Sequence, residues 1–359
     1  MRILCFIDNL GSGGAQRQLV NLALGFQNKG HEVSFLVYHQ ADFYLPLLQE
    51  YNIHVTLINP NSYIKRIWQC RRFIRRGKYD VVLSFLETPS FIAEVAAIPS
   101  KHWKLIVGER SSSPSILRSL KGRLYRFFHL LADYVVSNSY TNKRLVKQAN
   151  PLLKEEKNKT IYNTYELDKL NPTRFFKKQV EDDKFHLVIA ASHQRLKNLK
   201  NLAYAVNLLS EQEKSILSID WYGNQVQECF LENMNCVVKL GLQQIIHFYP
   251  PTLDIYQKMV DAKAVGLFSI YEGLSNTICE AMCLGKPVIT TDVSDNRLII
   301  DDPQLISDAN LPSSIAKSLS YLLSLSNEDL KQIGINNRRK AEKLFDKEII
   351  VNQYLTLMQ

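Results

Sequence analysis

Short apolar segments alternate with helix-like segments twice along this chain, once in each half. In the first half, runs typical of β-strands cover residues 3–7, 32–38, 53–58, 80–85, 104–107 and 134–137. A second series covers residues 185–191, 216–222, 264–270 and 287–291. Strands that alternate with helices form parallel sheets with helices on both faces. The sequence therefore predicts an α/β fold built from two doubly wound domains.

A polar segment between the two series, residues 169–184, contains Pro172 and is the predicted linker. Residues 1–168 then form an N-terminal domain, and a C-terminal domain begins at residue 185. The length of 359 residues agrees with this division, because a single core rarely organises so many residues. Two such domains facing one another place a cleft between the carboxyl ends of their strands, where ligands bind in these sheets.

The net charge of +9 is concentrated in the first half of the chain. Residues 1–170 hold 24 Lys and Arg against 13 Asp and Glu, whereas residues 171–359 hold 20 against 22. Two basic stretches, 65–78 and 118–128, mix cations with leucines and aromatic residues. This composition favours an anionic membrane surface or a phosphorylated ligand. Nucleic acid is the alternative partner, although no usual nucleic-acid-binding module is legible.

Several classes of protein are disfavoured. No apolar run approaches the roughly 20 residues that cross a bilayer, and the start of the chain is typical of a first strand, so we expect a cytosolic protein. Six cysteines fit no zinc or redox spacing; Cys279 and Cys283 provide at most half a metal site and are expected to be reduced and buried. The sequence contains no Asp-x-Asp, so we expect neither a metal nor another cofactor.

The segment 271–289 carries two glutamates, Glu272 and Glu280, separated by seven residues. Glu272 follows a predicted strand, and Glu280 falls in the predicted helix that comes next. A Gly-containing turn between strand and helix exposes backbone N–H groups, and the first N–H groups of a helix attract anions. The segment therefore predicts an anion site at a strand end.

Two further loops follow strands. Gly11, Gly13 and Gly14 come after the first strand, where they permit close approach to a phosphate or form only a tight turn. Arg195 and Lys197 come after the strand 185–191, where they neutralise a diphosphate or form only a solvated basic turn. His193 in the same loop is expected to be a polar turn residue.

With these motifs in place, the chain resembles the retaining glycosyltransferases of the GT-B fold, family four. The strongest similarity is the segment 272–289, which resembles the family's Glu-seven-Glu signature together with the Glu-Ala-Met, Gly and Pro-Val-Ile that follow. The loop 13–17, Asn163 and the segment 197–202 resemble three further family motifs. The resemblance implies a nucleotide-sugar-binding domain at 185–340 and a final helix, 341–359, that packs back towards the N-terminal domain.

The resemblance also implies roles for individual residues. Glu272 contacts the donor sugar, Lys197 holds the diphosphate, and Glu280 accepts hydrogen bonds from the ribose. The remaining donor-binding residues implied are Gly13, Gly14, Asn163, Gly273, Leu274 and Ser275.

The chain departs from the family pattern in two places. Ser192 stands where the family has an arginine, and Arg195 is the expected substitute. The family's histidine after the fifth strand is absent, and Glu109 or Arg110 is expected to take its acceptor-side role.

The sequence therefore predicts a metal-independent, retaining hexosyltransferase that uses a nucleoside diphosphate sugar, with UDP the expected nucleotide. We expect a lipid-linked saccharide acceptor, a place in the biosynthesis of surface polysaccharides such as capsule or O-antigen, and a peripheral position on the inner face of the cell membrane. A nucleotide-sugar epimerase of the same fold and a basic nucleic-acid-binding protein are the alternatives.

Overall fold

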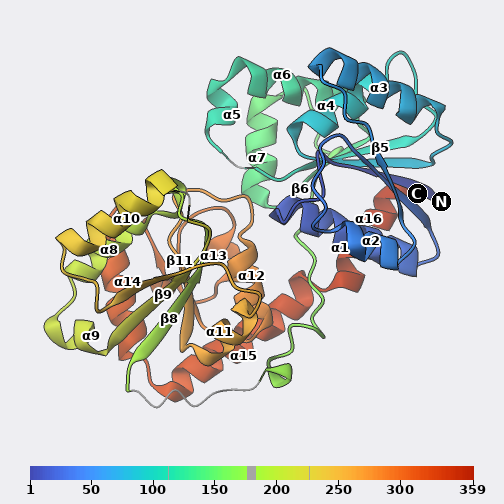
Figure 1. Ribbon diagram of the computed structural model, residues 1–359. Helices are drawn as coiled ribbons and strands as arrows, with labels where there is room; N and C mark the ends of the chain where they lie inside the picture. Colours follow the sequence, from blue (N-terminus) through green and yellow to red (C-terminus); the bar gives the residue numbers. More distant parts are fainter. Residues whose placement is uncertain (112, 176–182, 226) are drawn as a thin grey trace. The chain divides into compact units, whose positions relative to one another are not determined.

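The computed structural model describes residues 1–111, 113–175, 183–225 and 227–359, which divide into two compact units (Figure 1). The first unit comprises Met1–Thr164 together with Lys347–Gln359, and the second comprises Tyr165–Asp346. The chain therefore passes from one unit to the other after Thr164 and again after Asp346. The predicted linker, 169–184, includes residues 176–182, which lie outside the described residues.

The first unit contains a seven-stranded parallel sheet of order β3-β2-β1-β4-β5-β6-β7. Its strands are β1 (Arg2–Phe6), β2 (Glu32–Val37), β3 (His54–Leu57), β4 (Val81–Phe85), β5 (Lys104–Glu109), β6 (Tyr134–Ser137) and β7 (Asn158–Thr160). Its helices are α1 (Gly14–Asn28), α2 (Leu45–Glu50), α3 (Tyr63–Arg76), α4 (Glu87–Ala96), α5 (Ser115–Arg118), α6 (Leu120–Phe128), the short η1 (His129–Leu131), α7 (Tyr140–Ala149) and α16 (Lys347–Met358). All six strands predicted in this half are present; β7 was not predicted.

The second unit contains a six-stranded parallel sheet of order β10-β9-β8-β11-β12-β13. Its strands are β8 (Phe185–Ala190), β9 (Leu217–Tyr222), β10 (Ile246–Tyr249), β11 (Ala264–Leu267), β12 (Val288–Thr291) and β13 (Ile306–Ser307). Its helices are η2 (Pro172–Arg174), η3 (Arg195–Lys197), α8 (Leu199–Asn207), α9 (Glu211–Ile216), α10 (Gln227–Lys239), α11 (Ile255–Asp261), α12 (Asn276–Cys283), α13 (Asn296–Ile299), η4 (Pro303–Leu305), α14 (Pro312–Ser324) and α15 (Asn327–Leu344). β10 and β13 were not predicted from the sequence.

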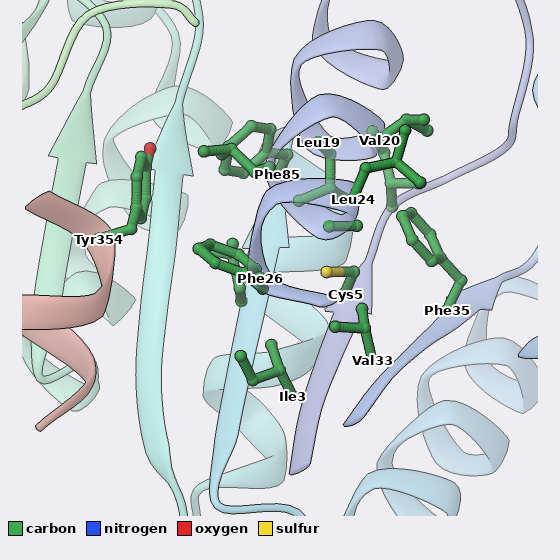
Figure 2. Packing of buried hydrophobic residues seen from close by; sticks show 14 of the residues in the cluster. Ile3, Cys5, Leu19, Val20, Leu24, Phe26, Val33, Phe35, Phe85 and Tyr354 are labelled. Atoms are coloured by element: carbon green, nitrogen blue, oxygen red, sulfur yellow. The ribbon is translucent and has the colours of Figure 1, made fainter. Parts of the chain in front are cut away.

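Successive residues of β1, β2, β4, β5 and β6 belong to two different hydrophobic layers. In β1, Ile3 and Cys5 lie in one layer, and Leu4 and Phe6 lie in the other. Figure 2 shows the first layer, where side chains of β1, β2 and α1 pack together with Tyr354 of α16. Because strand residues alternate with a period of two, both faces of the sheet are buried. This arrangement confirms the predicted doubly wound α/β architecture.

The last helix belongs to the core of the first unit. A Cβ atom added to Gly25 of α1 would lie 2.4 Å from Val351 Cγ2 of α16, so the missing side chain permits the two helices to approach closely. Ile350, Val351 and Tyr354 of α16 are buried in the same hydrophobic layer as α1. The final helix, expected at 341–359, begins only at Lys347, because the backbone of Phe345 and Asp346 pairs with that of Tyr165.

Two predictions about composition can be compared with the structure. All six cysteines are free, and Cys5, Cys70, Cys279 and Cys283 are buried, as expected for a reduced protein. Within the described residues, no helix combines the length and the apolar character needed to cross a membrane.

Candidate functional site

Lys197 and Glu272 form an ion pair at the carboxyl edge of the second sheet. Lys197 belongs to η3, which follows β8, and Glu272 follows β11, the neighbour of β8 in the sheet. The lysine Nζ lies 2.5 Å from Glu272 Oε1, which also accepts a hydrogen bond of 2.7 Å from Ser269 Oγ. Both charged side chains are largely buried. The structure thus places together the cation and the carboxylate that the sequence assigned to the same strand edge.

Asn198 fixes the turn that presents Lys197. Its backbone has a positive φ of 66°, a left-handed conformation that Asn tolerates better than most residues. Its buried amide donates hydrogen bonds to the carbonyl oxygens of Phe268 at 3.0 Å and Ala309 at 2.7 Å. The turn after β8 is therefore tied to the end of β11, which carries the Glu272 loop. This role of Asn198 was not predicted, although an Asn at a strand–helix turn is a signal for left-handed backbone.

Helix α12 begins at the same edge. Ser275 caps it, with its side-chain oxygen accepting a 3.3 Å hydrogen bond from the backbone N–H of Ile278. Leu274 and Ser275 are buried, and the carbonyl of Gly273 accepts a hydrogen bond from Ser294 Oγ. The first N–H groups of a helix have no intrahelical partner and favour negative charge. The start of α12 therefore provides backbone donors beside the Lys197–Glu272 pair.

Glu280 lies within α12 and is buried, with Oε1 accepting a hydrogen bond of 3.3 Å from the hydroxyl of Tyr256 in α11. Another residue of the same helix, Thr277, donates a hydrogen bond of 2.7 Å to the carbonyl of Ala190 at the end of β8. These contacts hold α12 against the strand edge. The role of Glu280 at a ribose stays a prediction.

Arg195 does not join the pair of Lys197 and Glu272. Its guanidinium forms two hydrogen bonds with Glu232 of α10, at 3.1 and 2.6 Å, and its side chain is 70% exposed. The carboxylates of α10 raise the pKa of Arg195 above its ordinary value. The structure therefore directs the expected substitute for the family arginine towards α10.

His193 is not the polar turn residue that the sequence analysis expected. It is buried and packs among the rings of Trp221, Phe230 and Phe248. Burial lowers its pKa to about 4, so the ring is neutral at physiological pH. Its ring faces other aromatic side chains because the loop after β8 folds back onto β9 and β10, which sequence spacing does not reveal.

Gly13 and Gly14 lie at the start of α1, after β1. Gly13 is the N-cap, and a Cβ atom at this position would lie 2.2 Å from the side-chain oxygen of Gln16. Gln16 is itself held by a hydrogen bond of 3.0 Å from Nε2 to Asp8 Oδ1. The glycine therefore leaves room for Gln16 to fold over the helix N-terminus, which lies at the carboxyl edge of the first sheet.

Glu109 and Arg110, the two expected acceptor-side residues, lie on opposite faces of the first sheet. The strand β5 extends two residues beyond its predicted end and includes Glu109. Because side chains alternate along a strand, Glu109 shares a face with Leu105 and Val107, which lie in a different hydrophobic layer from Ile106.

The face that carries Glu109 holds a buried ion network. Glu109 Oε2 lies 2.8 Å from the fully buried Arg126, and Glu109 Oε1 lies 2.9 Å from His129 Nε2. Arg126 also pairs with Glu87, and His129 Nδ1 lies 2.6 Å from Glu94. Burial raises the pKa of Glu109, but Arg126 and His129 outweigh this effect and hold it at about 2. The geometry thus gives Glu109 a structural role within the unit.

Arg110 and Asn163 meet on the other face. Arg110 Nη1 donates a 3.2 Å hydrogen bond to Asn163 Oδ1, and Nη2 donates one of 2.6 Å to the hydroxyl of Tyr354. The guanidinium carbon lies 3.8 Å from the ring centroid of Phe85, at the end of β4. The structure therefore brings together two predicted site residues that are 53 positions apart in the sequence.

Two parallel sheets, each flanked by helices and each in its own unit, form the architecture of a GT-B glycosyltransferase. Family models agree with this conclusion: "Glycosyltransferase Family 4" matches residues 12–169, and "Glycosyl transferases group 1" matches residues 171–340. The chain belongs to these glycosyltransferases, and it is an enzyme of that class.

Two curated relatives from Campylobacter jejuni match the chain along almost its whole length. One is the GalNAc-alpha-(1->4)-GalNAc-alpha-(1->3)-diNAcBac-PP-undecaprenol alpha-1,4-N-acetyl-D-galactosaminyltransferase, which is 26% identical over 100% of this chain and 98% of its own length. The other is the N-acetylgalactosamine-N,N'-diacetylbacillosaminyl-diphospho-undecaprenol 4-alpha-N-acetylgalactosaminyltransferase, which is 24% identical over 98% of this chain and 97% of its own length.

Solved structures support the same fold. HepE of Anabaena, in complex with UDP and glucose, matches with a TM-score of 0.85 and 18% identity over 99% of this chain and 98% of that one. A glycosyltransferase from Rickettsia africae matches with a TM-score of 0.84 and 18% identity over 99% of this chain and 97% of that one.

Proposed function

We propose that this glycosyltransferase moves a sugar from a UDP-linked donor to a saccharide carried on a polyprenyl diphosphate lipid, with retention of anomeric configuration and without a metal. The observation that carries the proposal is the end-to-end similarity to two enzymes whose names specify saccharides on diphospho-undecaprenol. Such a reaction extends a lipid-linked glycan for a surface polysaccharide, such as capsule or O-antigen, at the inner face of the cell membrane.

The donor chemistry rests on the second unit. Lys197 is the cation that stabilises the leaving diphosphate as its charge develops, and the start of α12 contributes backbone N–H groups from the segment 273–275. Glu272 contacts the donor sugar, and its bond to Lys197 sets the position of both groups before substrate binds. Glu280 binds the ribose. Within the described residues, no cluster of three or more metal-binding side chains is present. In this proposal, the charge of Lys197 stabilises the leaving diphosphate.

Gly13, Gly14 and Asn163 of the first unit are further donor-binding residues in this proposal. Arg195 is the weakest member of the catalytic set, because its bonds to Glu232 occupy its guanidinium. Arg110 takes the acceptor side in preference to Glu109, which faces the buried network.

The proposed membrane contact uses helices α3 and α6, which both pack against α4 and are joined by a hydrogen bond of 2.9 Å between the hydroxyls of Tyr63 and Tyr125 (Figure 1). Leu120, Leu124 and Phe127 form an exposed apolar stripe at helical spacing on α6. The exposed cations around this surface are Lys65, Arg72, Arg76, Arg118, Lys121 and Arg123. Apolar side chains surrounded by cations are typical of helices that lie on anionic bilayers.

Two arginines of the basic stretch have internal partners. Arg71 donates to the carbonyls of Val95 and Ile98, and Arg75 donates to those of Ala96, Ile98 and Ser100. They therefore stabilise the end of α4. Arg72 and Arg76 instead line an open groove of about 560 Å³ together with Trp68, and both are exposed arginines of α3 that can contact a membrane.

The decisive experiment offers the purified protein a panel of UDP-, GDP- and dTDP-sugars with and without a short-chain polyprenyl diphosphate saccharide, in buffer that contains EDTA. The proposal expects a lengthened lipid-linked product from a UDP-sugar only when the acceptor is present, and NMR of that product shows the donor's anomeric configuration. An epimerised UDP-sugar formed without acceptor would instead identify an epimerase. Salt-sensitive binding of random duplex DNA, with no transfer, would favour the nucleic-acid alternative.

A further inference from the structure

Arg110 carries a positive charge that no carboxylate within the described residues neutralises. Its contacts are the amide oxygen of Asn163, the hydroxyl of Tyr354 and the ring of Phe85, all of which are neutral. Arg126, the buried guanidinium of the same unit, pairs instead with Glu87 and Glu109. Partly buried cations usually have charged partners, since removal from water weakens their solvation.

The surroundings hold this guanidinium in one orientation. Phe85 supports its plane, and a Cβ atom on Gly108 would lie 2.4 Å from the Phe85 ring, so the glycine makes room for that ring. Tyr354 is fully buried in α16, and its hydroxyl fixes Nη2. Arg110 Nε has no hydrogen-bond partner in the described part of the chain, and each terminal nitrogen has a second N–H beyond the one its bond uses. The side chain is thus oriented in advance and retains unused donors.

The position of Arg110 is that of a ligand-binding residue. It follows β5 at the carboxyl edge of the first sheet and lies over the end of β4. β4 neighbours β1, and the strand order reverses between these two strands. Ligands of doubly wound sheets bind outside the carboxyl ends at such a reversal. The loop with Gly13 and Gly14 follows β1 on the same edge.

We propose that Arg110 binds a phosphate oxygen of a diphosphate-containing substrate and that Tyr354 of the C-terminal helix is the residue that positions it. A planar guanidinium with free N–H groups matches phosphate geometry, and charge-assisted hydrogen bonds are stronger than neutral ones. The inference rests on the proposed function, which supplies two diphosphates: one in the nucleotide-sugar donor and one that links the acceptor saccharide to its lipid.

The test compares Arg110→Met, Arg110→Lys and Tyr354→Phe with the unaltered enzyme. Initial rates are measured while the acceptor is varied at saturating donor and then while the donor is varied at saturating acceptor. Arg110→Met should raise KM for the substrate whose diphosphate is bound by about tenfold or more, and the arm in which KM changes identifies that substrate. Arg110→Lys should show a smaller rise in KM than Arg110→Met, because lysine keeps the positive charge but lacks the paired N–H groups of a guanidinium.

Tyr354→Phe removes one hydroxyl and keeps the buried ring. It should raise the same KM by about two- to fivefold, in the same arm as Arg110→Met, while the melting temperature of the protein stays close to that of the unaltered enzyme. A purely structural role of the hydroxyl would change the melting temperature without this selective effect on KM. Arg144→Met is the matched control, because Arg144 is an exposed arginine of α7 whose bond is to Thr141.

A measurement without turnover separates this inference from the proposed function. Calorimetry with inorganic pyrophosphate should show binding to the unaltered protein that Arg110→Met weakens severalfold and Arg144→Met does not. Unchanged KM values in both arms and unchanged pyrophosphate binding in Arg110→Met and Arg110→Lys would overturn the inference. Failure of the unaltered protein to use any lipid diphosphate acceptor would overturn the proposed function alone, since the pyrophosphate comparison still judges Arg110.

Discussion

Replacement of Arg126 by Met should destabilise the first unit because it leaves a buried carboxylate without its main partner. Arg126 is 0% exposed, and the side chain of Glu109, which it contacts at 2.8 Å, is 6% exposed. Glu87 is less affected, since its side chain is 43% exposed and regains water. The variant therefore tests whether the network of Glu87, Glu94, Glu109, Arg126 and His129 holds the end of β5 in place.

Two independent arguments give similar values for the stability lost in Arg126→Met. Removal of one partner from a buried ion pair costs about 3–5 kcal/mol. Independently, the surroundings lower the pKa of Glu109 from 4.5 to about 2 in the folded protein. At roughly 1.4 kcal/mol for each pKa unit, the charged form gains on the order of 3 kcal/mol at neutral pH, with part of the gain due to His129. A loss of about 3 kcal/mol lowers the melting temperature of a unit of this size by about 6–12 °C.

The assay is differential scanning calorimetry at pH 7 on four proteins: the unaltered chain, Arg126→Met, Arg126→Met with Glu109→Gln, and Arg123→Met. Arg123 is an exposed residue of the same helix and should change the melting temperature little. The double variant should recover part of the lost stability, because the unpaired charge is gone. The reasoning fails if the double variant is less stable than Arg126→Met, or if Arg126→Met melts within 1–2 °C of Arg123→Met, given that 1 kcal/mol is worth about 2–4 °C here.

Four other predictions concern His129, the loop after β8 and the exposed surface of α6. Burial lowers the pKa of His129, but Glu94 and Glu109 outweigh this effect and raise the pKa to about 9. The charged imidazole should therefore stabilise the fold fully below pH 6.5, and the free energy of unfolding should fall by about 3 kcal/mol as the pH rises through 9. Urea titrations at several pH values should show this fall in the unaltered protein and not in His129→Gln. Lys197→Met should reduce kcat by about 10²–10³-fold with little change in melting temperature, and near-normal turnover would move the diphosphate role to Arg195 or Lys200. Asn198→Ala should lower the free energy of unfolding by about 2–4 kcal/mol, because it removes two hydrogen bonds and strains the left-handed turn. Asn198→Gly keeps the left-handed turn and should lower the free energy of unfolding by about 1–2 kcal/mol less than Asn198→Ala does. Equal losses in the two variants would exclude backbone strain as a cause. Serine at Leu120, Leu124 and Phe127 should reduce sedimentation with anionic liposomes, while Leu253→Ser, an exposed leucine of the second unit, should not; persistent binding would reject the α6 surface.

Much of the architecture could be predicted because parallel α/β sheets have a strong local signature. Buried parallel strands require continuous apolar runs, and nearly all such runs appear as strands near the expected bounds. The missed strands β7, β10 and β13 lie at sheet edges or are short, where polar residues are tolerated and the pattern fades. The contact between Lys197 and Glu272 was also foreseeable, because loops after neighbouring parallel strands meet at one edge.

The partners of individual side chains were decided by the tertiary structure. Arg195 follows the expected strand, but Glu232 of α10 lies 37 residues away in sequence and takes its guanidinium. Arg110 depends on Tyr354, 244 residues away, which reaches it only because α16 packs on the first unit.

The contrast is sharpest at Glu109 and Arg110. The sequence by itself predicted the fifth strand and placed both residues at its carboxyl end. It did not determine that β5 continues through Glu109, and that single extension sends the two side chains to opposite faces of the sheet. The Glu109 carboxylate then contacts Arg126 and His129 in the interior, whereas the Arg110 guanidinium contacts only neutral groups among the residues that the structure describes. Strand periodicity is local, whereas the charges that neutralise a buried group come from distant segments and exist only in the folded chain.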